Sequence, residues 1–270
     1  MRHLVAKALL TVGLTSSLAV AGNITLTGHD DDFHQSSNAV AQAGAMFTFA
    51  RNGSALPVLS FDSGTELTTL LTSLGIPFTN VDPNNAAAVT DALFNSALYS
   101  SFAVASDSSC GGCDNGAAGE ANIAAHATAI ANFINAGGGI VGFAGANSAG
   151  YYSFVPQTAT SVGGAPSTGY TATGIAGIPA VNGDATHNLF FNPGTNGESA
   201  FFQIAELNST GNGTIPAPAA ATLVCVACTT SGGIIGGGGG SAPEPATYLF
   251  MTGGLAGFAL IRRFRGVAGR

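Results

Sequence analysis

The chain has 270 residues, of which 46% are hydrophobic and only 8% are charged, against about 25% charged residues in an ordinary globular protein. All 14 acidic residues lie between Gly22 and Pro245, where Arg51 is the one Lys or Arg, so this body carries a formal charge of −13 (1 minus 14). That charge excludes binding to nucleic-acid phosphates and disfavours anionic membrane surfaces, whereas cations and neutral glycans stay open as partners.

The first 21 residues have the three parts of a secretory signal peptide. Arg2 and Lys7 give the positive start, residues 8–21 are apolar, and Ala19-Val20-Ala21 supplies the small-x-small cleavage pattern. We therefore expect export and cleavage by signal peptidase after Ala21, which leaves a body at residues 22–230. A buried N-terminal helix is the alternative.

Apolar runs and helix-like amphipathic segments alternate over the first part of the body. The expected strands are 23–27, 56–61, 77–81, 101–105 and 140–144, and the expected helices are 37–50, 65–74, 84–99 and 120–136. This alternation predicts an α/β fold, a flavodoxin-like doubly wound parallel sheet with helices on both faces. After Ala149, Gly, Pro, Thr and Asn become dense, and strand-like pieces at 169–173, 201–205 and 222–226 indicate an irregular second half of the same domain.

Polar residues follow four of the predicted strands, and ligands of open α/β sheets bind at the carboxyl ends of the strands. The candidate rim residues are His29, Asp30, Asp32, His34, Asp62, Asp107 and Asn147. The cluster at 29–34 holds two His and three Asp, which could bind a divalent cation. The alternative is turn chemistry, in which such side chains cap helices or bind loop amides. His187 and Glu206 could fold back over the same rim, or His187 is an ordinary loop histidine.

The four cysteines form two Cys-x-x-Cys pairs, Cys110 with Cys113 and Cys225 with Cys228. In an exported chain, two local disulfides are the simplest pairing. A zinc site built from four thiolates and a thiol-redox site are the alternatives. The first pair lies in a Ser/Gly/Asn-rich loop rather than at the start of a helix, which counts against redox activity.

The body also resembles a known fold. Thr27-Gly28-His29 after the first strand, a helix ending in Gly137–Gly139, and the run Ile140–Gly145 resemble the class I glutamine amidotransferase-like fold, especially its trehalose-utilisation-protein-like branch. The resemblance covers residues 23–207 and includes a later His and acidic residue, here His187 and Glu206. It places Ala144 where the amidotransferases carry their Cys nucleophile, which implies that glutamine hydrolysis is lost.

The end of the chain has three segments. A Gly-rich linker at 231–242 contains five consecutive glycines, then Pro243-Glu244-Pro245 precedes an uncharged apolar run at 248–261, and Arg262-Arg263 follows it. Residues 243–270 resemble the PEP-CTERM sorting signal of exosortase substrates in Gram-negative bacteria. The resemblance implies a transmembrane helix with a cytoplasmic basic end, transient inner-membrane anchoring, and processing near the tripeptide to give a cell-surface or extracellular protein. An ordinary tail anchor is the alternative.

Together these features predict an exported, exosortase-processed surface or extracellular-matrix protein with a non-catalytic amidotransferase-like domain. Its expected partners are signal peptidase, exosortase and, as in a biofilm matrix, exopolysaccharide. The competing hypothesis is a secreted metal-assisted hydrolase or carbohydrate-modifying enzyme that uses the His/Asp rim. The sequence offers no nucleophile–base pair, which favours the first hypothesis, and a divalent cation is the one cofactor that it indicates.

Overall fold

The computed structural model of the chain describes residues 21–184, 186–231 and 234–235. The predicted signal peptide up to Val20, most of the predicted linker and the whole sorting segment at 243–270 lie outside these residues. Within the part of the chain that is described, no helix has the length and apolar character needed to cross a bilayer.

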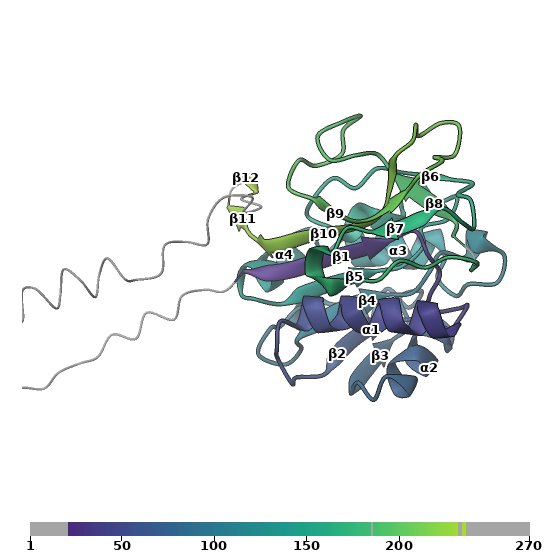
Figure 1. Cartoon of the computed structure of the whole chain (residues 1–270). Helices are drawn as coiled ribbons and strands as arrows, with labels where there is room; N and C mark the ends of the chain where they lie inside the picture. Colours follow the sequence, from purple (N-terminus) through teal and green to yellow (C-terminus); the bar gives the residue numbers. More distant parts are fainter. Residues whose placement is uncertain (1–20, 185, 232–233, 236–270) are drawn as a thin grey trace, which may run out of the picture.

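Five parallel strands make up one half of a ten-stranded mixed sheet (Figure 1). In sheet order they are β3 (Phe78–Val81), β2 (Val58–Phe61), β4 (Ser101–Val104), β5 (Gly139–Gly142) and β1 (Gly22–Thr27). The α/β class and the parallel strands of the first half are confirmed. In a flavodoxin-like sheet the first strand lies between the second and the third, whereas here β1 lies beyond β5, so the flavodoxin-like order is not confirmed.

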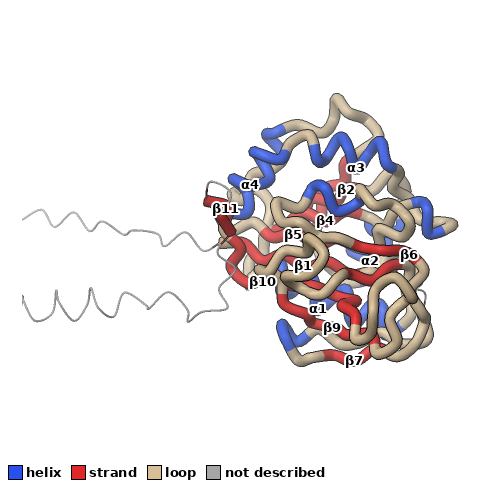
Figure 2. Tube along the Cα trace, turned by 90° about the horizontal axis from the view of Figure 1, so that it is seen from above, coloured by secondary structure: helices blue, strands red, loops and turns tan. Residues whose placement is uncertain are grey.

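Helices cover both faces of this parallel half. The helices are α1 (Ser37–Arg51), α2 (Glu66–Ser73), α3 (Ala117–Ala124) and α4 (Ala127–Asn135). Successive strand residues point to opposite faces: Ile140 packs in one core with Ile130 of α4, while Val141 packs in the other with Phe47 of α1. Figure 2 shows α3 and α4 following one another along one side of the sheet.

The second half of the chain adds antiparallel strands beyond β1. They are β10 (Ala219–Cys228), β9 (Gln203–Asn208), β8 (Asn188–Phe190), β7 (Tyr170–Ala172) and β6 (Ser161–Gly163). The long strand β10 pairs antiparallel with β1, β8 and β9. This confirms the irregular, strand-containing second half, although β6 and β8 were not predicted. A separate hairpin joins β11 (Thr230–Ser231) to β12 (Ile234–Ile235), so β12 lies within the predicted linker.

Two predicted helices differ from the structure. Residues 84–99 contain turns and one short 3-10 helix, η1 (Asp91–Leu93), instead of an α-helix. The Asp82 carboxylate accepts a hydrogen bond from the Asn84 N–H, and this local bonding competes with helix formation. The helix predicted at 120–136 starts earlier and is divided into α3 and α4, because His126 leaves helical geometry with φ −97 and ψ 27. Its Nδ1 lies 2.6 Å from the Asp91 carboxylate.

Candidate functional site

The carboxyl ends of the parallel strands share one edge of the sheet, as predicted, but several candidate rim residues serve their own loops. Asp62 accepts hydrogen bonds from the N–H groups of Gly64 and Thr68 at the start of α2. Asp107 accepts one from the Ser109 N–H and caps the 3-10 helix η2 (Ser108–Cys110). Asn147 is exposed, and its backbone N–H donates to Ser109 Oγ. At these positions the structure supports the turn-chemistry alternative.

His29 is directed into the core and away from the rim. Its Nε2 lies 2.9 Å from Glu206 Oε2, and its Nδ1 lies 2.8 Å from Thr186 Oγ1. Neither the His29 nor the Glu206 side chain is exposed to solvent. The same Glu206 carboxylate accepts hydrogen bonds from Gln42, Thr222 and the Val181 N–H. We expected Glu206 to accompany His187 over the rim; it is instead the centre of a buried network that joins β1 to β9 and β10.

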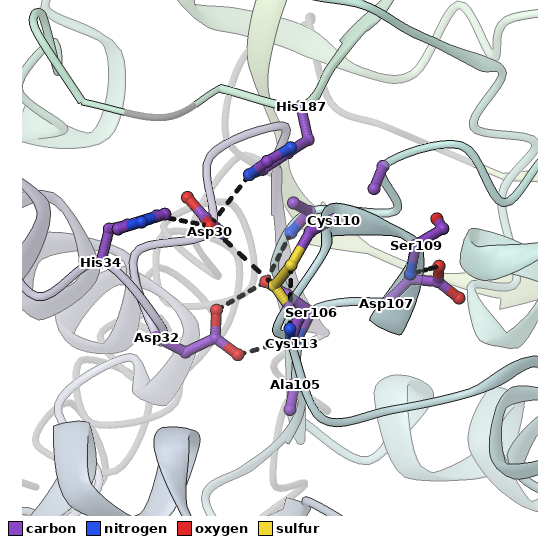
Figure 3. The surroundings of a disulfide bond; sticks show 12 residues. Asp30, Asp32, His34, Ala105, Ser106, Asp107, Ser109, Cys110, Cys113 and His187 are labelled. Atoms are coloured by element: carbon purple, nitrogen blue, oxygen red, sulfur yellow. Dashed lines mark hydrogen bonds and ion pairs between the residues drawn. A yellow bond between two sulfur atoms is a disulfide. The ribbon is translucent and has the colours of Figure 1, made fainter.

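Asp30, His34 and His187 come together at the rim (Figure 3). Asp30 Oδ2 lies 2.7 Å from His34 Nδ1 and 2.9 Å from His187 Nε2. The Asp30 side chain is only 1% exposed, whereas the side chains of His34 and His187 are 45% and 21% exposed. The other carboxylate oxygen of Asp30, Oδ1, is buried without a hydrogen-bond partner. A buried carboxylate is thus held between two imidazoles that reach solvent.

Local backbone contacts position each member of this triad. The carbonyl of Asp30 accepts hydrogen bonds from the N–H groups of Phe33 and His34, and this tight turn places His34 beside the Asp30 carboxylate. His187 precedes β8, and its backbone N–H donates to the Gly28 carbonyl at 2.8 Å. A Cβ at Gly28 would collide with the Asn188 carbonyl, so glycine allows the segment that carries His187 to approach β1.

The side chain of Asp32 points away from Asp30, His34 and His187 and toward the end of β4. Its carboxylate accepts hydrogen bonds from the Ser106 N–H at 2.7 Å and the Ser106 Oγ–H at 2.5 Å. Burial raises the pKa of Asp32 to about 7, although both bonds from Ser106 lower it. Sequence reasoning missed the role of Ser106, whose only signal was its place directly after a predicted strand.

The rim is rich in buried carboxyl groups and lacks basic side chains other than histidine among the described residues. Arg51, at the end of α1, binds the Leu56 carbonyl and Ser100, which precede β2 and β4 at their amino ends. Burial raises the pKa of Glu66 to about 8, and burial together with the Asp107 carboxyl raises the pKa of Glu120 to about 9. Burial also raises the pKa of Asp31 far above its ordinary value, and nearby Glu206 adds to this effect.

The loop after β5 contains Ala144, the residue at the nucleophile position of the amidotransferase resemblance. In this loop Ala146 has left-handed geometry, with φ 45. Ala144 is buried, and its N–H donates to Ser106 Oγ. The short 3-10 helix η3 (Tyr151–Phe154) follows, so β5 does not lead directly into an α-helix. Gly145 makes room for the ring of Tyr152, whose hydroxyl accepts a hydrogen bond from the Gly145 N–H.

Both predicted local disulfides are present. The Cα atoms of Cys110 and Cys113 are 5.9 Å apart and those of Cys225 and Cys228 are 5.8 Å apart, within the usual range for a disulfide. No cysteine of the chain is left free. The first pair lies next to Asp30, and the second is buried in β10.

Comparison of the chain with protein-family models, with curated proteins and with solved structures finds no match.

Proposed function

We propose that the chain is an exported, exosortase-processed surface protein whose α/β body binds one divalent transition-metal ion between Asp30, His34 and His187. The signal-peptide pattern and the PEP-CTERM-like tail support the export and sorting part. The observation that carries the metal part is Asp30 Oδ2, which lies 2.7 Å and 2.9 Å from two imidazole nitrogens contributed by distant parts of the chain.

The donor set suits a zinc-like ion. Imidazole nitrogen and carboxylate oxygen are ligands that Zn²⁺ and its neighbours accept. The three donor atoms lie within 4.8 Å of one another, and ligand bonds of about 2.1 Å place neighbouring donors of a tetrahedral ion about 3.4 Å apart. Asp30 Oδ2 already contacts both imidazole nitrogens, so binding needs only small movements of the three donor atoms around the ion.

Electrostatics also favours a cation at this place. The Asp30 carboxylate is buried between two imidazoles. Arg51, the one Lys or Arg among the described residues, lies at the amino ends of the strands. Burying a carboxylate without a Lys or Arg partner is costly, and a bound metal ion would supply a fixed positive charge beside it.

Zinc titration by calorimetry tests the proposal, with the full chain kept in its disulfide form at pH 7. We expect one strong site in the wild type, weakened in both His34→Ala and His187→Ala by at least about tenfold, because each variant removes a direct ligand. His126→Ala is the matched control, since His126 also lies against a carboxylate, Asp91, but no second imidazole of the described residues joins that pair. Absence of binding by the wild type, or equal weakening in the control, would contradict the proposal.

A second candidate is metal-assisted hydrolysis, because three protein ligands leave a zinc ion one position open to water. The partial exposure of His34 and His187 is the observation that favours it. Zinc-loaded wild type and His187→Ala should be compared on an activated ester and an activated phosphodiester. Turnover by the wild type alone would support the enzyme, and no turnover by a chain that binds zinc would support the binding protein.

A further inference from the structure

The Cys110–Cys113 loop lies directly against the proposed metal site (Figure 3). Cys113 Sγ is 3.9 Å from Asp30 Oδ2, the same oxygen that contacts His34 and His187. The two sulfur atoms and a carboxylate oxygen of Asp30 all lie within 4.8 Å of one another. Asp30 is thus shared by two sets of potential metal ligands, one with two imidazoles and one with two sulfur atoms.

The oxidation state of this pair decides whether its sulfur atoms can act as ligands. A thiolate is the form of cysteine that binds metals, and it is a strong ligand for Zn²⁺. The Cys113 N–H donates to Cys110 Sγ at 2.9 Å, an arrangement that stabilises negative charge on that sulfur. Cys110 is only partly buried and is followed by the exposed Gly111 and Gly112, so a reductant can approach it.

We propose that the Cys110–Cys113 pair, when reduced, supplies a thiolate as the fourth ligand of the ion held by Asp30, His34 and His187, and that oxidation of the pair weakens this site. The inference rests on the proposed metal-binding function and deepens it. It assigns the reduced site to a thiolate-seeking ion such as Zn²⁺, and it makes metal affinity depend on the local redox state.

The chemistry balances with one external reductant. Two electrons from a dithiol, accompanied by two protons, break the Sγ–Sγ bond and leave two thiols while the dithiol closes to its own disulfide. Binding of the ion by one thiolate then releases the proton of that thiol to solvent, while the other cysteine stays a thiol. Reoxidation by a second disulfide reverses these changes and leaves Asp30 and the two imidazoles as the ligands.

The second cysteine pair provides the matched control. Cys225 and Cys228 have the same spacing, but both are fully buried in the sheet. Among the described residues, neither belongs to a cluster of potential metal ligands. Reduction of this pair should therefore leave the affinity for the ion unchanged.

Cobalt and zinc titrations of the full chain test the inference. Two forms of the chain are titrated with Co²⁺ and then with competing Zn²⁺: the oxidised form and a form reduced by a phosphine. The phosphine becomes a phosphine oxide, whose oxygen comes from water. In the reduced wild type we expect a sulfur-to-cobalt charge-transfer band and an affinity higher by about tenfold or more, because a thiolate joins the ligands. The double variant Cys110→Ser/Cys113→Ser should lack both the charge-transfer band and the gain in affinity, whereas Cys225→Ser/Cys228→Ser should keep both. Circular dichroism checks that each variant folds.

The outcomes separate this inference from the proposed function. Binding by the oxidised chain with no band and no gain on reduction would overturn the inference and leave the function standing. A band that persists in Cys110→Ser/Cys113→Ser but is lost in Cys225→Ser/Cys228→Ser would also overturn it. A reduced chain that binds cobalt equally well after His34→Ala and His187→Ala would show a thiolate site independent of the imidazoles, and it would overturn the shared site.

Discussion

The replacement Glu206→Gln should destabilise the protein strongly, because Glu206 is the acceptor for a buried network. Its Oε2 accepts hydrogen bonds from Gln42 Nε2 at 3.0 Å and Thr222 Oγ1 at 2.8 Å and lies 2.9 Å from His29 Nε2. Its Oε1 accepts one from the Val181 N–H at 2.7 Å. An amide replaces one acceptor oxygen by an NH₂ group, so at least one buried donor must then face another donor.

The size of the effect follows from the least damaging orientation of the new amide. The NH₂ group would face Val181, and the oxygen would keep the other three contacts. Loss of one hydrogen bond to a charged group, with a buried N–H left unsatisfied, costs about 2–4 kcal/mol. That is a large part of the roughly 5–15 kcal/mol by which a typical domain is stable.

Glu198→Gln is the matched control. Glu198 is also buried, but it accepts a hydrogen bond from the Thr160 N–H while its Oε1 has no partner. Burial raises its pKa to about 8, so at pH 7 the carboxyl is already mostly neutral and an amide changes little. We expect Glu198→Gln to lie within about 1 kcal/mol of the wild type.

Urea unfolding followed by far-ultraviolet circular dichroism measures both variants, since the chain contains no Trp for fluorescence. Equal free energies of unfolding for Glu206→Gln and the wild type would refute the reasoning. So would equal destabilisation by both variants.

Three further predictions follow from the site and the ends of the chain. The metal-free protein should lose stability as pH rises from about 4 to about 9. In that range the raised pKa values of Asp32, Glu66 and Glu120 make the folded state bind more protons than the unfolded state. Melting temperatures that rise with pH would contradict this. Neither the wild type nor Ala144→Cys should hydrolyse glutamine, since a nucleophile also needs a base and an oxyanion hole, and ammonia release by either would count against this. Mass spectrometry of the mature surface protein should find neither residues 1–21 nor Arg262–Arg270, and an intact C-terminal peptide would count against sorting.

The local pattern was sufficient to predict the strands of the parallel half, but not their order in the sheet. Leu67, Leu70 and Leu71 are buried at helical spacing in α2, and the buried residues of β2 form a short run bounded by loop residues. Their periodicity can be seen locally, although they pack in one core with residues as distant as Val224. No α-helix forms at 84–99, because the side chains of Asp82 and Asn95 accept hydrogen bonds from nearby backbone N–H groups. The helix propensity of the alanines in this stretch does not outweigh these local bonds.

Long-range pairing could not be predicted from the sequence. The position of β1 beyond β5 and next to β10 depends on contacts between residues as distant as Thr27 and Thr222. The cluster at 29–34 was recognised as a candidate cation site, but His29 and His34 looked equivalent within it. The structure separates them, because the segment before β8 brings Thr186 to His29 and His187 to Asp30.

The most direct test of the account is anomalous X-ray scattering from a crystal of the chain soaked in Zn²⁺. Data collected on both sides of the zinc absorption edge locate the ion without assumptions about its ligands. We predict one strong anomalous peak bounded by Asp30, His34 and His187, and no peak there in His187→Ala. An empty site, with zinc bound elsewhere on the acidic surface, would contradict the central claim.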